Sequence, residues 1–343
     1  MNWFTKDPLQ LITFNSYGTD NHLYVRGRAL EDETIDLEQK GLWGLFVNSW
    51  KRFESDEIKN VALKLKFPNG KTITSITDNH GYFKFDEKLS NLKSMTNSEG
   101  WLKFEVAYDD KNIKRTIQNE NRFLGEVLIP STNAEFGVIS DVDDTILHTG
   151  VVSTLKWRVL FNTIFTSAGK RLPLEGAAEF YQLLHRGKSG DNANPIFYVS
   201  HSPWNLYRYL DFFLKKNNFP KGPILLRSFK TIFTRKSRQG QPQKQKEIID
   251  ILNTYPESKF ILIGDGGEHD ADIYIDISKE FPNQVIAIYL RSVNHKKKMD
   301  RIEGLLKNYN LIPILMVESS QQAIEHARIN GFVKNQKQSS NSE

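Results

Sequence analysis

Apolar and polar residues alternate in a series of short runs that begins near Leu23 and ends near Pro130. Alternation of this kind buries one face of each strand and leaves the other in water, as in antiparallel sheets. Turn-forming segments such as Pro68–Gly70 and Asp78–Gly81 separate the runs. The pattern predicts an all-β, sandwich-like domain over residues 1–132. Its expected strands are LYVRGRAL, VALKLKF, KTITSIT, GYFKFD, WLKFEVAY and FLGEVLIP.

The pattern changes beyond Pro130, where continuous apolar runs alternate with stretches of helical spacing. Strands that are apolar throughout are typical of parallel sheets with both faces covered, and alternating strands and helices build such sheets. We therefore expect an α/β domain over residues 133–332, a parallel sheet with helices on both faces. The polar residues 333–343 predict a disordered tail. The expected strands are FGVISD, PIFYVS, ILLR, KFILIGD and QVIAIYL.

The composition limits the classes of protein to which the chain can belong. Its 343 residues are 39% hydrophobic and 25% charged, which suits a folded protein with two cores. There is no cysteine, so a disulfide framework, a thiolate zinc site and a cysteine nucleophile are excluded. The net charge is +5, the 46 basic residues are interspersed with 41 acidic ones, and the densest basic run is only Lys296–Lys298. This run fits a solvated helix face better than a nucleic-acid stripe, so we expect no nucleic-acid partner.

The N-terminal sequence does not resemble a signal peptide, and no apolar stretch is long enough to span a bilayer. The chain is therefore expected to be soluble and cytoplasmic. One segment, Leu155–Phe165, mixes large apolar and basic residues at roughly helical spacing, which fits either a membrane-surface helix or a small cap helix. A basic stretch, Arg227–Arg238, suits either an anionic surface or a solvated loop. A peripheral membrane contact therefore stays open.

The expected strand that begins at Phe136 ends in three acids within four positions, Asp141, Asp143 and Asp144. Carboxylates so close repel one another, so they stay ionised together only beside a cation or hydrogen-bond donors. Oxygen ligands of this kind suit Mg²⁺, which we expect as the cofactor. The alternative is an Asp-rich turn whose acids cap the following helix.

The D-x-D-x-T pattern of Asp141–Thr145 resembles the first motif of haloacid dehalogenase phosphatases. The resemblance implies a Rossmannoid α/β fold in which Asp141 is the nucleophile and Asp143 the general acid-base, with Thr145 in the catalytic motif and Asp144 in a supporting role. In this chemistry Mg²⁺ neutralises the repulsion between carboxylate and phosphate. The aspartyl phosphate is then hydrolysed, and Asp143 first protonates the leaving oxygen and later deprotonates the attacking water.

A phosphatase of this type needs a hydroxyl and a lysine later in the chain, and both have candidates. Ser200 ends the apolar run that starts at Pro195, and His201 beside it is a second expected substrate contact. The alternative for Ser200 is helix capping. Lys244 opens an expected helix, where it would bind phosphate and balance the charge of the phosphoaspartate, with Lys246 as its nearby competitor.

The apolar run KFILIGD leads into a glycine-rich turn that holds two more acids. Glycines let the backbone approach a ligand closely. Asp265 is therefore the expected third metal ligand, beside Asp141 and Asp143. Asp270 is expected to support the site by positioning the ligands. The alternative is a tight loop without a ligand.

The surroundings of these motifs resemble a smaller group, the catalytic domain of actin-patch-type phosphatidate phosphatases and their bacterial relatives. The resemblance covers about residues 135–315 and rests on SDVDDTILHTG, RLPLEGAAEFYQLL, FYVSHSPWNLY and FILIGDGGEHDADIY. It implies Mg²⁺-dependent removal of phosphate from phosphatidate, leaving diacylglycerol. Two departures, Gly266 where the family has Ser and His201 where it has Asn, bear on substrate contacts rather than on the expected catalytic residues.

The spacing of the motifs leaves room for only a minimal cap, and an open site favours bulky substrates over small metabolites. We therefore expect a phosphomonoester hydrolase that forms an aspartyl-phosphate intermediate. Its expected substrate is a lipid phosphate, namely phosphatidate. Two alternatives stay open. One is the same chemistry on a phosphoprotein or a soluble phosphometabolite, and the other is a non-enzymatic membrane or protein adaptor. The sequence carries no signal for an oligomeric state.

Overall fold

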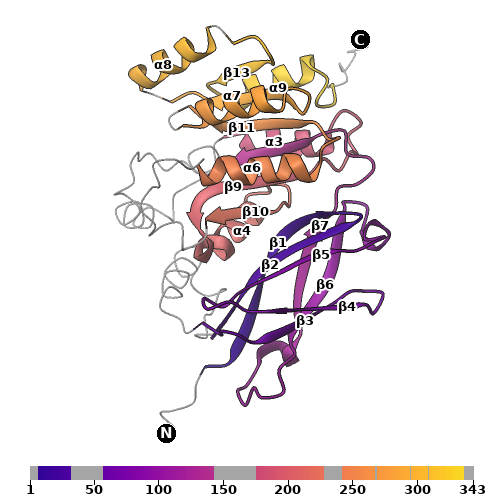
Figure 1. Cartoon of the computed structure of the whole chain (residues 1–343). Helices are drawn as coiled ribbons and strands as arrows, with labels where there is room; N and C mark the ends of the chain where they lie inside the picture. The colour runs from indigo at the N-terminus through magenta and orange to yellow at the C-terminus, as the bar shows by residue number, and fades with distance from the viewer. Residues whose placement is uncertain are drawn as a thin grey trace. The chain divides into compact units, whose positions relative to one another are not determined.

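The computed structural model describes residues 7–31, 57–142, 175–227, 242–266, 269–293, 295–307 and 309–335. The chain forms two compact units (Figure 1). The first consists of Met1–Ser131, Ser202–Phe213 and Gly222–Lys236, and the second of Thr132–His201, Leu214–Lys221 and Ser237–Glu343. The predicted domain boundary after residue 132 stays a prediction. Several predicted features lie outside the described residues, namely Asp143, Asp144, Thr145, the segment Leu155–Phe165, most of the basic stretch Arg227–Arg238, and residues 336–343 of the expected tail.

The first unit is built on one seven-stranded sheet with the strand order β4-β3-β6-β7-β1-β2-β5. The sheet is mixed, because β1 and β7 run parallel while the other pairs are antiparallel. Its two end strands, β4 and β5, also contact each other, and Ser75 Oγ on β4 donates a hydrogen bond of 2.6 Å to Lys84 O on β5. The sheet is therefore nearly closed into a barrel. The strands are β1 (Leu9–Thr19), β2 (His22–Glu31), β3 (Ala62–Lys66), β4 (Thr72–Ile76), β5 (Tyr82–Lys88), β6 (Trp101–Tyr108) and β7 (Phe123–Leu128).

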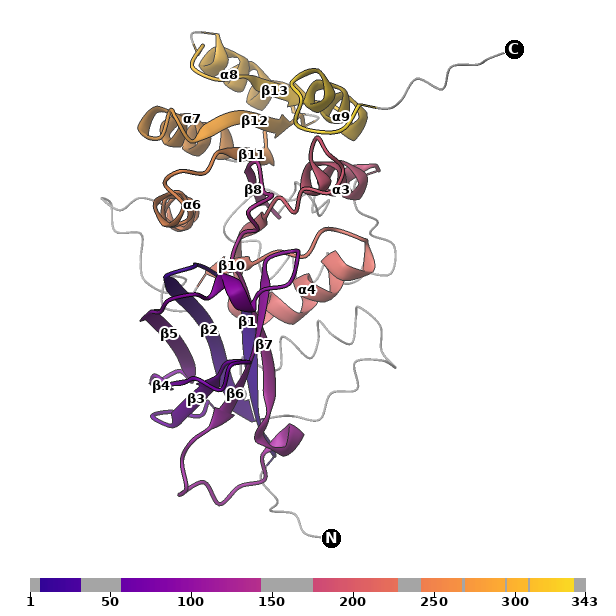
Figure 2. The ribbon, with the colours of Figure 1, turned by 90° about the vertical axis from the view of Figure 1, so that its right-hand side faces the viewer.

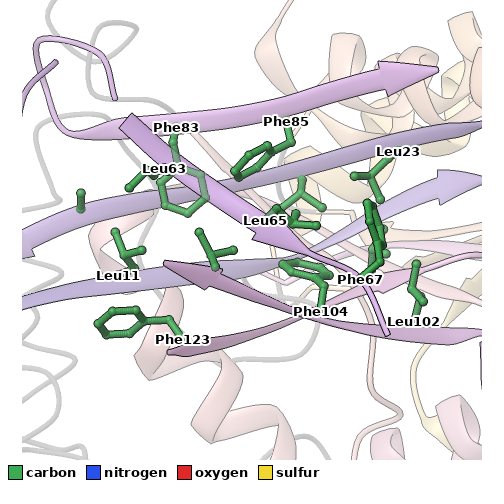
Figure 3. Packing of buried hydrophobic residues seen from close by; sticks show 14 of the residues in the cluster. Leu11, Leu23, Leu63, Leu65, Phe67, Phe83, Phe85, Leu102, Phe104 and Phe123 are labelled. Atoms are coloured by element: carbon green, nitrogen blue, oxygen red, sulfur yellow. The ribbon is translucent and has the colours of Figure 1, made fainter. Parts of the chain in front are cut away.

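The core of this unit lies inside the curled sheet, where the apolar positions of the alternating runs meet (Figure 3). Gly27 on β2 faces Phe83 on β5, and a Cβ atom on Gly27 would lie 2.1 Å from the Phe83 ring. The missing side chain at Gly27 thus makes room for an aromatic ring in the core. Labelled members of the core are Leu11, Leu23, Leu63, Leu65, Phe67, Phe83, Phe85, Leu102, Phe104 and Phe123.

The prediction of a sandwich-like first domain is wrong, because the strands form one nearly closed sheet and not two packed sheets. Alternation correctly indicates that each strand has a buried and a wet face. It does not indicate whether the buried faces belong to two sheets or to one sheet that curls around its own core. Long-range pairings, such as β1 with β7 and β4 with β5, decide between these, and no local pattern encodes them.

Within the first unit, residues 202–213 pack on β1. Phe14 stacks on Trp204 with ring centroids 4.4 Å apart. The Tyr207 hydroxyl accepts a hydrogen bond of 2.7 Å from the Asn15 amide. Arg208 donates a hydrogen bond of 2.9 Å to the side chain of Gln10.

The other sheet has six strands in the order β10-β9-β8-β11-β12-β13 (Figure 2). The pairs β8–β9, β8–β11, β11–β12 and β12–β13 are parallel. All residues of β8 and β11 are buried, as their apolar sequences predict. The strands are β8 (Gly137–Asp141), β9 (Ile196–Pro203), β10 (Ile224–Arg227), β11 (Phe260–Asp265), β12 (Val285–Arg291) and β13 (Ile314–Val317).

The described parts of the chain contain six α-helices, of which five belong to the second unit, whereas most of α4 belongs to the first. Among them, α3 contacts α9 and α6 contacts α7. None of the helices in the described ranges is long and apolar enough to cross a bilayer. The helices are α3 (Ala177–Arg186), α4 (Tyr207–Lys216), α6 (Gln243–Thr254), α7 (Asp270–Glu280), α8 (Lys296–Leu306) and α9 (Ser320–Ile329).

The predicted haloacid-dehalogenase-like Rossmannoid fold, with helices on both faces of a parallel sheet, is corrected as well. The described residues form a nearly closed mixed sheet and a parallel sheet, and more of them lie in strands than in helices. They do not clearly define a Rossmann fold with a helical layer on each face. The apolar strands misled the prediction, because a fully buried strand indicates that both of its sides are covered but not what covers them.

Candidate active site

Three neighbouring strands of the parallel sheet bring polar side chains to the same edge. Asp141 is the last residue of β8, and Asp265 is the last residue of the adjacent strand β11. On the other side of β8, Val199 of β9 pairs with Asp141, so Ser200 follows immediately beyond it. Parallel strands share a carboxyl edge, and ligand sites of open parallel sheets gather at this edge. The three residues therefore occupy neighbouring positions at the edge where chemistry is expected.

Lys244 reaches this edge from the second position of α6. Its Nζ lies 2.8 Å from Asp141 Oδ1 and also forms an ion pair with Asp270 Oδ1. The Lys244 and Asp141 side chains are 0% exposed, and that of Asp270 is 1% exposed. The predicted competitor, Lys246, is exposed. The structure thus brings Lys244, and not Lys246, against the expected nucleophile.

The charge state of Lys244 follows from two opposed effects. Burial lowers the pKa of its ammonium group, but the Asp141 and Asp270 carboxylates raise it, and the net result is a pKa well above the usual value. Lys244 is therefore positively charged at neutral pH. A buried cation with two carboxylate partners is held in a fixed geometry, because any displacement leaves a charge uncompensated in a medium of low polarity.

Asp270 links the lysine to the other acidic strand end. It is the first residue of α7, and its Oδ2 accepts a hydrogen bond of 3.0 Å from the Asp265 amide. Its other oxygen binds Lys244. A Cβ atom at Gly264 would lie 2.5 Å from Asp270 Oδ2, so glycine at this position allows the carboxylate to approach the backbone. Asp270 thus holds Lys244 and the backbone of Asp265 together.

Tyr274 is a residue of this site that the sequence did not reveal. Its hydroxyl donates a hydrogen bond of 2.9 Å to Ile263 O on β11, and Lys244 Nζ lies 5.9 Å from the centre of its ring. Burial raises the pKa of Tyr274 well above its usual value, so its hydroxyl keeps its proton. In the sequence, Tyr274 reads as one more apolar position of a helix. It ends the segment FILIGDGGEHDADIY, which carries the family resemblance, but nothing in that segment assigns it a role.

The arrangement of acids bears on the expected cofactor. At full ionisation Asp141, Asp265 and Asp270 carry three negative charges, against the single positive charge of Lys244. A divalent cation held by carboxylate oxygens from two adjacent strands fits this excess. Within the described ranges, no group of three potential ligands is close enough to hold a metal. Asp143, the third expected ligand, lies outside those ranges.

Ser200 is buried and His201 half-buried, both on β9. All of the predicted site residues that the structure describes belong to the second unit, and Lys244 contacts both Asp141 and Asp270. Their roles in catalysis stay predictions.

Comparison with known proteins agrees with the motifs. Residues 136–292 match the sequence model of a family described as phosphatidate phosphatase APP1, catalytic domain. The phosphatidate phosphatase APP1 of Saccharomyces cerevisiae is 39% identical over 156 residues, which are 45% of this chain and 25% of the yeast protein. An uncharacterized protein of Schizosaccharomyces pombe is 27% identical over 220 residues, 63% of this chain and 34% of that protein. The similarity thus extends over about a third or less of these curated relatives.

Among solved structures, the crystal structure of Bacteroides thetaiotamicron EndoBT-3987 with Man5GlcNAc product covers 73% of this chain and 69% of its own, at 7% identity and a TM-score of 0.22. A similarity this low carries no argument about fold or function.

The resemblance expected from the motifs is confirmed. Residues 136–292 are similar to the catalytic domain of APP1-type phosphatidate phosphatases. All of the predicted site residues fall within this range, including Asp141, Ser200, Lys244, Asp265 and Asp270.

Proposed function

We propose that this protein is a phosphatase that removes the phosphate group from phosphatidate and releases diacylglycerol. The observation that carries the proposal is the buried ion pair between Lys244 and Asp141 at the carboxyl edge of a parallel sheet. This pair lies in the segment similar to the catalytic domain of phosphatidate phosphatases. An ionised carboxylate with a fixed direction is what nucleophilic attack on phosphorus requires.

The proposed reaction has two steps. Asp141 attacks phosphorus, a bond forms between its carboxylate oxygen and phosphorus, and the bond from phosphorus to the lipid oxygen breaks. Asp143 gives its proton to the departing oxygen. A water molecule, deprotonated by Asp143, then attacks the aspartyl phosphate and releases inorganic phosphate together with the free carboxylate of Asp141.

Lys244 and Ser200 act on the transferred group in this proposal. The Lys244 ammonium balances the charge that builds up beside Asp141, which favours the transition state more than the ground state. The Ser200 hydroxyl, one residue beyond the strand position paired with Asp141, donates a hydrogen bond to a phosphoryl oxygen. His201 contacts the remainder of the substrate.

We propose Mg²⁺ as the cofactor, with Asp141, Asp143 and Asp265 as the residues that hold it. When bound, the ion supplies the positive charge that lets a carboxylate approach a phosphate. The excess of negative charge in the buried group of Asp141, Asp270 and Lys244 supports this assignment. In this proposal Asp144 has a supporting role next to the nucleophile, and Thr145 belongs to the catalytic motif, as the resemblance implies.

We also propose that the protein acts in the cytoplasm and meets its substrate at an anionic membrane surface, through the start of α8. Arg291 ends β12 and pairs with Asp265, and the Gly266 amide donates a hydrogen bond of 2.8 Å to Arg291 O. The exposed Lys296 and Lys297 begin α8 a few residues later. A Cβ atom at Gly266 would lie 3.0 Å from Met299 in the first turn of α8, so this turn approaches the residue that follows the proposed metal ligand. In this proposal its two lysines attract a bilayer that contains phosphatidate.

The test is release of phosphate from phosphatidate in detergent micelles, from a phosphopeptide and from soluble phosphomonoesters, with Mg²⁺ and with a chelator. The expected result is Mg²⁺-dependent release from phosphatidate by the wild type and none by Asp141→Asn, which keeps the size of the side chain. Release by Asp141→Asn at the wild-type rate contradicts the proposed nucleophile. Faster release from the phosphopeptide or a soluble ester assigns a different substrate. No release from any substrate indicates an adaptor.

A further inference from the structure

Ser140, the residue before the proposed nucleophile, forms a short hydrogen-bonded chain on β8. Its side chain is completely buried. Its Oγ donates a hydrogen bond of 2.7 Å to Asp141 O and lies 2.5 Å from the hydroxyl of Tyr181. Because Ser140 has one hydroxyl proton and gives it to Asp141 O, the Tyr181 hydroxyl is the donor in the second bond. The chain therefore runs from Tyr181 through Ser140 to the backbone of Asp141.

Tyr181 is well placed to anchor this chain. It lies on α3, and its ring stacks on Tyr198 and meets Phe219 edge to face, with ring centroids 6.4 and 5.3 Å away. Burial raises the pKa of Tyr181 far above its usual value, so the hydroxyl keeps its proton and remains a donor. A ring packed on two sides gives the hydroxyl little freedom to move.

The hydrogen bonds of Ser140 and the ion pair of Asp141 hold two successive residues of β8. Successive side chains of a strand point to opposite sides. Ser140 is held by Tyr181 of α3, whereas the carboxylate of Asp141 is held by Lys244 of α6. Pairing between β8 and β11 extends only to Ser140, so Asp141 lies where the regular ladder with β11 ends. A bond to its carbonyl fixes the peptide unit at the point where the strand leads into the site.

We propose that Ser140 and Tyr181 are positioning residues that fix the backbone of Asp141 for attack on phosphorus. This inference rests on the proposed function, in which Asp141 is the nucleophile. Neither residue touches the reacting atoms. Their effect is exerted through the direction of the Asp141 carboxylate, and a small misplacement of a reacting group lowers turnover strongly.

The first test compares two tyrosines of the same aromatic stack. Tyr181→Phe keeps the ring and removes the hydroxyl that binds Ser140. We expect kcat for the enzyme's best substrate to fall roughly tenfold with KM unchanged. Tyr198→Phe is the matched control, because its hydroxyl is also buried but donates to Pro220 O at 2.7 Å. The control should lose a similar amount of thermal stability and keep the kcat of the wild type.

The serine gives a second pair of variants. Ser140→Ala should lower kcat as Tyr181→Phe does, and Ser140→Thr, which retains a hydroxyl, should restore most of it. The kcat of the double variant Ser140→Ala/Tyr181→Phe should equal that of the less active single variant, because both changes break the same series of hydrogen bonds. Equal kcat in Tyr181→Phe and Tyr198→Phe, or additive losses in the double variant, would overturn the inference.

A spectroscopic readout keeps this test separate from that of the proposed function. The sequence contains a single Asp-Val pair, Asp141-Val142. Labelling Asp with ¹³C at the carbonyl and Val with ¹⁵N therefore isolates the Asp141 peptide bond by NMR. Its carbonyl shift should change in Tyr181→Phe and stay constant in Tyr198→Phe, whatever the substrate. An unchanged shift in Tyr181→Phe refutes the positioning role, whereas a wild type without turnover on any phosphomonoester refutes only the proposed function.

Discussion

Lys244 Nζ and Asp141 Oδ1 lie 2.8 Å apart, and neither side chain is exposed to solvent. The lysine approaches from the start of α6, and the aspartate stands at the end of β8. A buried cation next to a carboxylate keeps the latter ionised and aimed in one direction. Substitution of either residue of this pair should therefore have a large effect on turnover and on the free energy of unfolding.

Replacement of this lysine should affect both turnover and stability. In Lys244→Met two buried carboxylates, Asp141 and Asp270, lose their shared partner. We expect unfolding free energy to fall by about 3–5 kcal/mol and kcat to fall at least about 100-fold. Lys246→Met is the control, because Lys246 is exposed two positions further on α6. Phosphate release and urea unfolding measure the two effects. Wild-type turnover in Lys244→Met would rule out a catalytic role for Lys244.

The same pair predicts a dependence of stability on alkaline pH. Burial lowers the pKa of Lys244, but Asp141 and Asp270 raise it to well above its usual value. A group whose pKa is raised by folding stabilises the folded state fully below its unfolded pKa of about 10.4, and this contribution disappears as the pH rises through the folded pKa. The difference in unfolding free energy between the wild type and Lys244→Met should therefore be constant from neutral pH to about pH 9.5 and shrink above about pH 10.4.

Urea unfolding of both proteins across this range measures the difference directly. Comparison with Lys244→Met is needed because buried tyrosines, such as Tyr274 and Tyr198, also have raised pKa values and titrate at alkaline pH. Their contribution is largely common to the two proteins. A difference that already shrinks between pH 7 and 9 contradicts a raised pKa of Lys244.

Asp270 should influence metal use without being a reacting group. One of its oxygens binds Lys244 and the other accepts the Asp265 amide hydrogen. Asp270→Asn replaces one acceptor with a donor, so one of these two contacts is lost and Asp265 is held less firmly. We expect the Mg²⁺ concentration for half-maximal activity to rise roughly 10–100-fold. Asp272→Asn is the control, since Asp272 is partly exposed and paired with Arg301. An equal Mg²⁺ requirement in the wild type and Asp270→Asn would exclude this positioning of Asp265.

The sequence predicted the order of chemical groups better than the fold that carries them. Asp141, Ser200 and Asp265 were expected at the ends of apolar strands. Asp141 and Asp265 do end β8 and β11, whereas β9 continues past Ser200 to Pro203. Strand ends are local features, since an apolar run and the polar residue that follows it can be read directly. The sandwich was wrong because sheet closure depends on contacts between distant strands, such as β4 with β5.

Tyr181 and Tyr274 could not be found from the sequence for a related reason. Both lie on helices at positions that the periodicity assigns to the core, and both are indeed buried. Their hydroxyls matter because of single hydrogen bonds, from Tyr181 to Ser140 and from Tyr274 to Ile263 O. Helical spacing identifies the buried side of a helix but does not distinguish a structural tyrosine from one that anchors a strand of the site.

The lysines at the start of α8 allow a test of membrane contact that is independent of catalysis. A Cβ atom at Gly266 would lie 3.0 Å from the side chain of Met299, so the first turn of α8 approaches the end of β11. Lys296 and Lys297, both exposed, begin this turn. Each lysine near an anionic surface contributes about 1 kcal/mol of attraction. The double variant Lys296→Gln/Lys297→Gln should bind vesicles of phosphatidylcholine and phosphatidate on the order of tenfold more weakly at low salt.

The matched control removes two lysines from the other edge of the same sheet. Lys259 precedes β11 and Lys279 lies in the last turn of α7, and both are exposed. Lys259→Gln/Lys279→Gln changes the net charge equally and should leave vesicle binding and activity on vesicles unchanged. Turnover of a soluble phosphomonoester should be the same in both double variants, because neither alters the catalytic groups. Equal loss of vesicle binding in the two would attribute the effect to net charge, and no loss in either would exclude α8 as the membrane contact.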